Sequence, residues 1–175
     1  MPSRLRVPFG YLLGIVVVAV AHPTQASLAA GGAIAATGEA IRLWASGHID
    51  KTRALATGGP YAYTRNPLYL GSFVMATGVA VAAASPWAAL AVAVYFAAFY
   101  PSVMREEAAF LRGRFPEEYA TWAAAVPLFF PRLTPAGPRT TKFQWERVRR
   151  NREWQTAFAL PLMAAVLWAR GQLLP

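Results

Sequence analysis

The sequence predicts an all-α protein, a polytopic membrane helix bundle of about five transmembrane helices. Composition supports this class, because 56% of the residues are hydrophobic and only 14% are charged. The charges are also segregated, since residues 7–38 and 66–104 contain no Asp, Glu, Lys or Arg. At about 1.5 Å of rise per residue, the second interval approaches two crossings of a hydrocarbon layer about 30 Å thick.

The individual spans follow from the turn formers. The first charge-free interval is too short for two ideal spans of about 20 residues, so its helices must extend into the flanking sequence. His22-Pro23-Thr24-Gln25 predicts a turn between a helix from about Arg6 to Ala21 and another from about Ala26 to Ala45. Ser85-Pro86 divides the second interval, and Trp154 to about Leu174 is a fifth apolar run.

One proline and two charged residues add detail to these predicted spans. Pro161 predicts a kink in the last one. Glu39 and Arg42 fall in the final turns of the second, and a spacing of three places them on one helix face. We interpret them as an ion pair near the membrane interface.

The distribution of cations predicts the orientation. Lys and Arg in short loops remain on the cytosolic side, and here they avoid both the His22–Gln25 and the Ser85–Pro86 turns. An odd number of spans then places the C-terminus on the opposite side. The N-terminal run resembles a signal peptide, but its direct continuation into a second apolar helix favours retention. The basic residues outside the predicted spans lie in three segments: Arg4 and Arg6; Lys51, Arg53 and Arg65; and ten Lys or Arg residues from Arg105 to Arg152.

The net charge of +9 does not indicate nucleic-acid binding, because the cations lie beside membrane spans and not in a separate basic domain. Acidic lipid headgroups are their expected partners. Residues 139–153 mix cations with aromatic residues, which suits either a helix on the membrane surface or a solvated connector. The chain has no cysteine, and His22 and His48 are isolated, so no metal site is predicted.

Two sequence blocks carry the functional signal. The first, Gly58 to Gly71, combines turn formers, three tyrosines and Arg65 at the start of an apolar segment. The second begins at Arg105-Glu106-Glu107 and continues to Phe115-Pro116-Glu117-Glu118-Tyr119. Together they resemble the isoprenylcysteine carboxyl methyltransferase family and its relative, phosphatidylethanolamine N-methyltransferase. The resemblance covers about residues 51–131 of what we treat as one domain, 1–175.

This resemblance implies an integral membrane enzyme that binds S-adenosyl-L-methionine in a pocket at the cytosolic ends of its helices. In the family, a glutamate of the second block helps to hold the cofactor, and Glu107 has the matching position, nine residues before Pro116. We expect a carboxylate at this position to pair with the cofactor's ammonium group. Glu106 and the tyrosines have simpler explanations, as an arginine partner and as residues of an interfacial aromatic belt. The implied cofactor-binding residues are Arg53, Leu55, Ala56, Tyr61, Asn66, Pro67, Leu68, Tyr69 and Glu107.

The chain departs from the family pattern at two positions. Asn66 stands where the family's commonest motif has histidine, and asparagine can donate a hydrogen bond but cannot titrate. Val103 stands where the prenylcysteine enzymes have an arginine that helps to handle the substrate. The sequence identifies no catalytic base, and Arg105 and Tyr69 are candidates for positioning the reactants only.

Three interpretations compete. The leading one is a membrane methyltransferase that acts on a lipophilic or amphiphilic acceptor, in which the protein mainly aligns donor and acceptor. The second is a phospholipid methyltransferase that acts on an ethanolamine amine. The third is a non-catalytic membrane scaffold that retains the fold, which the absence of a charged residue at the centre of any span and the clustering of polar residues at one face disfavour.

Overall fold

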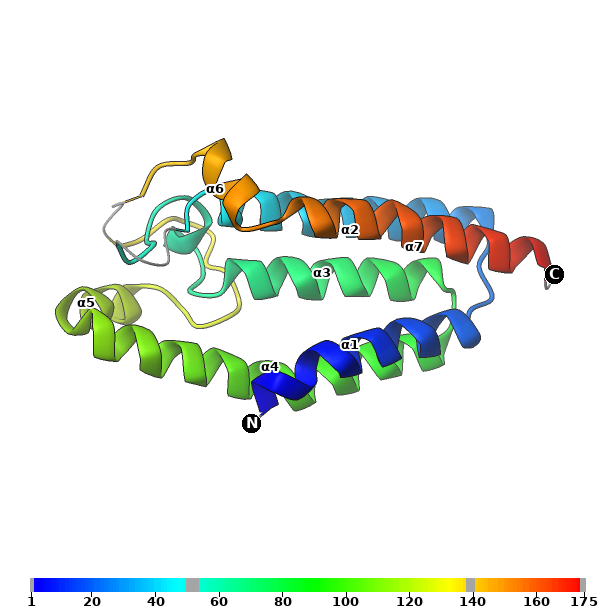
Figure 1. Cartoon of the computed structure of the whole chain (residues 1–175), viewed down its shortest axis with the longest axis horizontal. Helices are drawn as coiled ribbons and strands as arrows, with labels where there is room; N and C mark the ends of the chain where they lie inside the picture. Colours follow the sequence, from blue (N-terminus) through cyan, green and yellow to red (C-terminus); the bar gives the residue numbers. More distant parts are fainter. Residues whose placement is uncertain (1, 50–53, 138–140, 174–175) are drawn as a thin grey trace. The chain divides into compact units, whose positions relative to one another are not determined.

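The structure is a computed structural model, and it describes residues 2–49, 54–137 and 141–173. Within these residues it contains seven α-helices, one short 3₁₀-helix and no β-strand (Figure 1). The predicted all-α class is therefore confirmed. The elements are α1 (Pro2–Ala19), α2 (Gln25–Ser46), η1 (Gly59–Ala62), α3 (Pro67–Ala82), α4 (Pro86–Arg114), α5 (Pro116–Ala125), α6 (Trp145–Arg150) and α7 (Trp154–Leu173).

The turns between the first four long helices lie where the sequence predicts them. Thr24 ends the first turn by capping α2: its Oγ1 accepts a hydrogen bond from the Ser27 amide at 3.1 Å, and Ser27 Oγ accepts one from the Thr24 amide at 2.9 Å. Pro86 begins α4, a position where the missing amide hydrogen costs no hydrogen bond. The two turns meet, because the amide of His22 donates to the carbonyl oxygen of Ala83 at 2.8 Å.

The basic segment before α7 is helical in part. Among its described residues, 141–153, only Trp145–Arg150 is helical. The residues just before it are held in an extended path by contacts elsewhere: the Gln144 amide donates to the carbonyl oxygen of Gly47 at 2.9 Å, and Thr141 Oγ1 accepts from the Gly58 amide at 3.2 Å. A continuous helix through the whole segment is therefore wrong, whereas the placement of its short helix on a membrane surface and the alternative of a solvated connector stay predictions.

One helix in the described part of the chain, α4, is long and apolar enough to cross a membrane by length and composition. Its 29 residues correspond to about 43 Å of helix, more than the hydrocarbon thickness. Leu5–Ala19 and Pro67–Ala82 are apolar but shorter. The count of five spans therefore stays a prediction.

The chain divides into two compact units, which we describe separately. Unit 1 comprises Met1–Glu39, Phe73–Val103 and Thr156–Pro175, and unit 2 comprises Ala40–Ser72 and Met104–Gln155. Unit 1 contains most of the apolar helical residues. Unit 2 contains both motif blocks and the basic segment.

In unit 1, α2 and α3 approach each other at the level of the backbone. A Cβ atom added at Gly31 would collide with the backbone of Gly78 and Ala82, and one added at Gly78 would collide with the backbone of Gly31 and Ala35. Small residues therefore set the distance between these helices. The Ser27 hydroxyl adds a hydrogen bond to the carbonyl oxygen of Ala82 at 3.0 Å.

The remaining helices of unit 1 pack around this pair. Tyr95 on α4 donates a hydrogen bond to the carbonyl oxygen of Arg6 on α1 at 2.9 Å. The Arg170 guanidinium, near the end of α7, donates to the carbonyl oxygens of Val18 and Ala19 at 3.3 Å, where a cation favours the end of α1. The last turn of α7 thus lies at the same end of unit 1 as the turn between α1 and α2.

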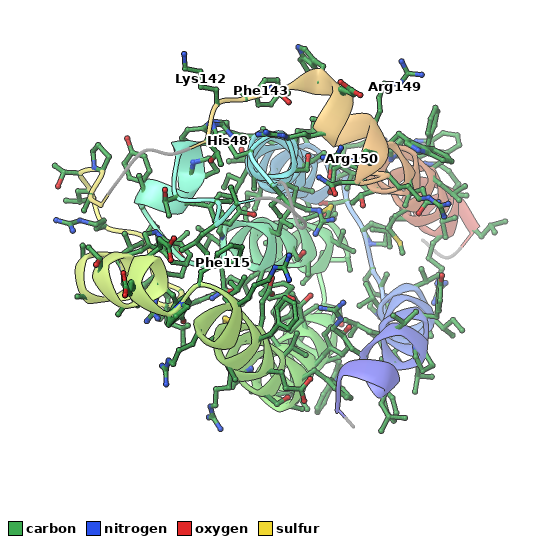
Figure 2. The ribbon with its side chains drawn as sticks, turned by 60° about the vertical axis from the view of Figure 1, so that its left-hand side comes forward. His48, Phe115, Lys142, Phe143, Arg149 and Arg150 are labelled. Atoms are coloured by element: carbon green, nitrogen blue, oxygen red, sulfur yellow. The ribbon has the colours of Figure 1, made fainter. Side chains whose placement is uncertain are left out.

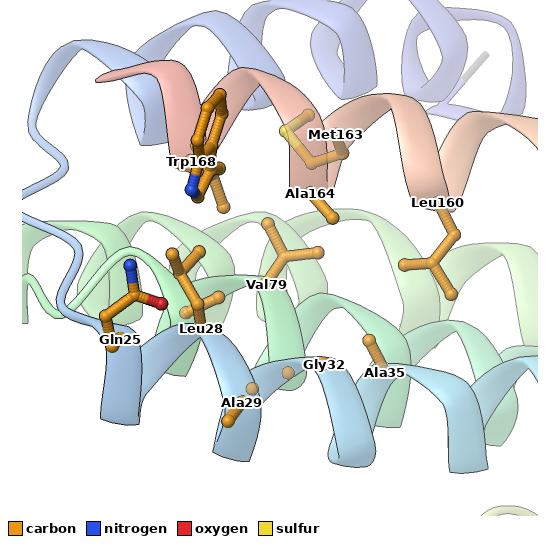
Figure 3. A pocket seen from close by; sticks show the side chains of 14 residues that line it. Gln25, Leu28, Ala29, Gly32, Ala35, Val79, Leu160, Met163, Ala164 and Trp168 are labelled. Atoms are coloured by element: carbon orange, nitrogen blue, oxygen red, sulfur yellow. The ribbon is translucent and has the colours of Figure 1, made fainter. Parts of the chain in front are cut away.

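Unit 1 also contains an apolar cavity of about 350 Å³ between α2, α3 and α7 (Figure 3). Gly32 borders it, and a Cβ atom added there would meet no atom within 4 Å. Of these two neighbouring glycines, Gly31 therefore packs against the backbone of α3, whereas Gly32 faces open space. Its labelled lining residues include Leu28, Val79, Leu160, Met163 and Trp168.

Gly31→Ala should lower the melting temperature of the detergent-purified protein, because its methyl group would force α2 and α3 apart at a cost of about 1–3 kcal/mol. Gly32→Ala is the matched control. It adds the same methyl group beside open space and should leave stability unchanged or raise it by about 0.4–1 kcal/mol. Equal melting temperatures for the two variants would show that α2 and α3 do not touch at Gly31.

Candidate functional site

The first motif block opens with a turn at residues 58–63, which we call the motif turn. It begins at two glycines, and neighbouring atoms leave no room for a side chain at either of them. A Cβ atom at Gly58 would collide with the carbonyl group of Thr141, and one at Gly59 would collide with the His48 ring. Gly59 also has φ +57°, which side chains rarely adopt. The His48 ring in turn packs against Phe143, with 5.9 Å between ring centroids (Figure 2). The turn is therefore fitted between the end of α2 and the basic segment.

The turn continues into the hydrophobic core of unit 2. The Trp122 indole donates a hydrogen bond to the carbonyl oxygen of Tyr61 at 2.9 Å, and both side chains are buried. Leu55 belongs to the same core, while Ala56 and Leu68 pack against it and are partly buried. Four of the predicted cofactor-binding residues thus line or border one apolar cluster. Its buried members are Ala45, Leu55, Tyr61, Tyr119, Trp122 and Val126.

The residues between the turn and α3 are fixed to the chain that follows α5. Asn66 donates from Nδ2 to the carbonyl oxygen of Leu128 at 2.8 Å, and its side chain is buried. The Thr64 hydroxyl donates to the carbonyl oxygen of Phe129 at 2.8 Å. Pro67 then starts α3 and is fully buried. The side-chain amide of Asn66 is therefore already bonded within the protein, to the carbonyl oxygen of Leu128.

The two motif blocks meet through two hydrogen bonds. The Tyr69 hydroxyl donates to Glu107 Oε2 at 2.9 Å, which joins the first turn of α3 to α4. Arg65 donates from Nη1 to the Tyr119 hydroxyl at 3.0 Å, which joins the motif turn to α5. Tyr119 itself is only 2% exposed, so this second contact lies at the edge of the core.

A buried ion pair lies in the same unit. Arg42 on α2 contacts Glu153, the residue before α7, and the two side chains are 18% and 5% exposed. Arg42 also donates to Ser72 Oγ and to the carbonyl oxygen of Leu68. This single guanidinium therefore links α2, α3 and the start of α7.

The pKa of the Tyr61 hydroxyl is shifted by burial and by the charged groups around it. Burial raises its pKa well above the ordinary value for tyrosine, and the charges of Glu107, Tyr69 and Glu153 raise it further. The Arg42 guanidinium acts in the opposite direction. Tyr61 therefore remains a neutral hydrogen-bond donor, and its hydroxyl lies within the electrostatic reach of two carboxylates and one cation.

Comparison with known proteins decides the family. Residues 10–118 match phospholipid methyltransferases, and this stretch includes both motif blocks as far as Glu118. The chain belongs to that family. The membership assigns it to the methyltransferases in general, in agreement with the resemblance carried by the two blocks.

Two curated relatives share part of the chain. It is 39% identical over 95 residues to the cobalt-zinc-cadmium resistance protein CzcN of Cupriavidus metallidurans. It is 40% identical over 95 residues to the nickel-cobalt-cadmium resistance protein NccN of Alcaligenes xylosoxydans xylosoxydans. Each match covers 53% of this chain and 44% of the relative, so the chain spans less than half the length of these relatives. No solved structure matches the chain.

For this phospholipid methyltransferase family member, the structure brings most predicted site residues into one unit. Tyr69 and Glu107 touch, and Tyr61 lies in the field of Glu107. Arg105 is exposed on α4, and Arg53 lies outside the described residues. No cluster of three or more His, Cys, Asp or Glu side chains occurs within the ranges that the structure describes.

The sequence analysis did not predict that Arg42 pairs with Glu153. It placed Arg42 at a membrane interface beside Glu39 and gave Glu153 no role. A signal was present, because both charges sit at the predicted cytosolic ends of spans, where bundle-facing ionisable residues mark sites. It also treated His48 as isolated, although the histidine packs directly against the motif turn.

Asn66→Leu should destabilise the protein even without ligand, because the carbonyl oxygen of Leu128 loses its hydrogen bond at 2.8 Å and keeps only the longer one from the Thr64 hydroxyl at 3.4 Å. Losing a hydrogen bond of this kind costs about 0.5–1.5 kcal/mol. Thermal unfolding in detergent measures this loss. Gln144→Leu removes a similar amide from an exposed position and should leave stability nearly unchanged. An unchanged melting temperature for Asn66→Leu would mean that the bond to Leu128 contributes nothing.

Proposed function

We propose that the protein is an integral membrane methyltransferase that moves a methyl group from S-adenosyl-L-methionine to a lipophilic or amphiphilic acceptor. The hydrogen bond between Tyr69 and Glu107 carries this proposal. It joins the two sequence blocks that resemble the cofactor-binding blocks of membrane methyltransferases, in a chain that belongs to the phospholipid methyltransferase family. The structure thereby supports one site built from both blocks.

The residues around this contact suit the cofactor chemically. Its ammonium group requires an anion, and Glu107 is a carboxylate whose orientation is held by the Tyr69 hydroxyl. Its adenosine moiety requires apolar and aromatic surface, which the partly buried Ala56 and Leu68 offer beside the buried Leu55 and Tyr61. When bound, the cofactor supplies an electrophilic methyl group on a sulfonium.

Positioning is the main contribution that this chain can make to methyl transfer. An in-line displacement requires donor and acceptor to be aligned and water to be excluded. The fixed motif turn and the buried Tyr61 provide a rigid wall for that purpose. Arg105 and Tyr69 remain the candidates for orienting the acceptor, and Arg105 is exposed on α4 where an acceptor headgroup can reach it.

The phospholipid amine remains a second candidate acceptor, since the matched family is described by phospholipid methylation. An ethanolamine amine must lose a proton before it is methylated, whereas a carboxylate or thiolate need not. Transfer of a labelled methyl group to phosphatidylethanolamine vesicles, compared with transfer to a lipidated carboxylate, distinguishes the two. Product in only one reaction assigns the acceptor class.

The two relatives raise metal resistance as a further candidate role. Their names state resistance to cobalt, cadmium, and zinc or nickel, and each shares 95 residues with this chain. In such a role the family's chemistry would act by modifying a membrane component. Growth of cells with and without the gene in graded cobalt or cadmium tests this connection. Equal tolerance would remove it.

We propose a five-span topology for the membrane, with the N-terminus and both motif blocks cytosolic. Contacts within unit 1 support it. The turn before α2 touches the turn before α4, and the last turn of α7 lies beside the end of α1. All three points carry few cations, in contrast to the basic segments.

Glu107→Gln should weaken S-adenosyl-L-methionine binding about ten- to a hundred-fold, because a charge-assisted hydrogen bond to the ammonium group becomes a neutral one. Isothermal titration calorimetry of the detergent-purified protein measures the effect. Glu106→Gln is the matched control, since its side chain points about 100° away around α4.

Both variants must elute and melt like the unmodified protein for the comparison to count. A larger loss in Glu106→Gln would show that Glu107 is not the ammonium partner. Absence of binding by the unmodified protein in every lipid and detergent would remove the methyltransferase proposal.

Reporter fusions at Pro175 and within residues 134–137 should report opposite compartments, because one span separates the two points in the proposed topology. The fusion at 134–137 is expected on the cytosolic side. Finding both reporters in the same compartment would show that α7 does not cross the membrane.

A further inference from the structure

The pair of Arg42 and Glu153 is built more tightly than a surface salt bridge. Both side chains are largely buried, and Arg42 is additionally bonded to Ser72 and to the carbonyl oxygen of Leu68. Burying two charges is costly even when they are paired, and a well-packed apolar pair is often as stable. Such a pair in a chain of this class therefore calls for a functional explanation.

Arg42 lies next to the residues that carry the proposed function. It contacts Leu68 through the backbone, and the following residue, Tyr69, binds Glu107. Glu107 and Arg42 both act on the Tyr61 hydroxyl, with opposite signs. A carboxylate and a guanidinium thus both lie within electrostatic reach of one neutral donor.

The amino-acid end of S-adenosyl-L-methionine is a zwitterion, so its pocket requires an anion for the ammonium and a donor for the carboxylate. Asn66 is one of the implied cofactor-binding residues and has a side-chain amide that could donate to the carboxylate, but this amide donates to the carbonyl oxygen of Leu128 and the side chain is only 8% exposed. An arginine is the better partner, because its planar fork matches a carboxylate with two parallel hydrogen bonds.

We propose that Arg42 binds the carboxylate of the cofactor, and that Glu153 is the counterion that holds the guanidinium in place when no cofactor is bound. This inference rests on the proposed function and adds a residue to the same site. Glu107 and Arg42 then form a charge pattern complementary to a free α-amino acid group. The cofactor carboxylate takes over part of the role of Glu153.

A purely structural role for Arg42 predicts something different. A guanidinium that only ties α2 to α3 and α7 affects every ligand of the site equally. A guanidinium that binds the carboxylate affects only ligands that carry one. S-adenosyl-L-methionine and its decarboxylated form provide this contrast, because they differ in the carboxylate and share the ammonium, the sulfonium and the nucleoside.

The test is calorimetric titration of the detergent-purified full chain with both compounds. The unmodified protein should bind S-adenosyl-L-methionine about ten- to a hundred-fold more tightly than the decarboxylated form. In Arg42→Gln this ratio should fall to about one, through loss of affinity for the carboxylate-bearing compound alone. Arg149→Gln removes an exposed arginine of the same unit, on α6, and should leave the ratio unchanged.

Two further variants keep the test decisive if Arg42→Gln is unstable. The double variant Arg42→Gln, Glu153→Gln removes both charges and so avoids leaving a buried carboxylate unpaired. It should show the same ratio of about one. Glu153→Gln alone should raise the ratio, because the guanidinium no longer has a competing anion.

Retention of the full ratio in the Arg42 variants would overturn the inference, as would an equal loss of affinity for both compounds. Collapse of the ratio in Asn66→Leu but not in Arg42→Gln would return the carboxylate to Asn66. Each of these results leaves the proposed function intact. Failure of the unmodified protein to bind either compound would instead remove the proposed function.

Discussion

The hydrogen bond from the Trp122 indole to the carbonyl oxygen of Tyr61 is the contact on which the candidate site depends. Trp122 is 1% exposed and lies in a core cluster that contains Leu55 and Tyr61 as well. A buried carbonyl group must find a donor, and the Trp122 indole on α5 supplies one here. The helix in which the second block ends therefore fixes the position of the first block, before any cofactor is considered.

Backbone groups elsewhere in unit 2 are satisfied in the same manner, by side chains from distant parts of the sequence. Asn66 and Thr64 donate to carbonyl oxygens after α5, and Asn151 donates to the carbonyl oxygen of Ser46 at 2.9 Å. Ser46 ends α2, so this last bond satisfies one of the carbonyl groups that a helix end leaves open. An irregular loop of this kind keeps a defined shape because its polar groups have fixed partners.

The sequence predicted helix existence and turn positions well, because charge-free intervals, Pro86 and the Thr24 cap act locally. It assigned Tyr69 and Glu107 to one site, which stays a prediction, and the two side chains touch. It failed to predict contacts between residues far apart in the sequence. Nothing near Asn66 indicates that its side-chain amide is used by Leu128, and the position of Arg42 at a span end does not single out Glu153, more than a hundred residues away, as its partner. Tertiary pairing of buried polar groups leaves no periodic pattern to read.

The segment before α7 shows how a site can extend beyond the part of a chain that carries its family signature. The family match ends at residue 118, yet Thr141 fits against Gly58 and Glu153 pairs with Arg42. Glycine at position 58 leaves room for the Thr141 carbonyl group, so the motif turn is shaped to receive this later segment. In the proposed site, residues outside the two blocks would then help to form the cofactor pocket. The buried Glu153 carboxylate is tolerated there because the Arg42 guanidinium pairs with it.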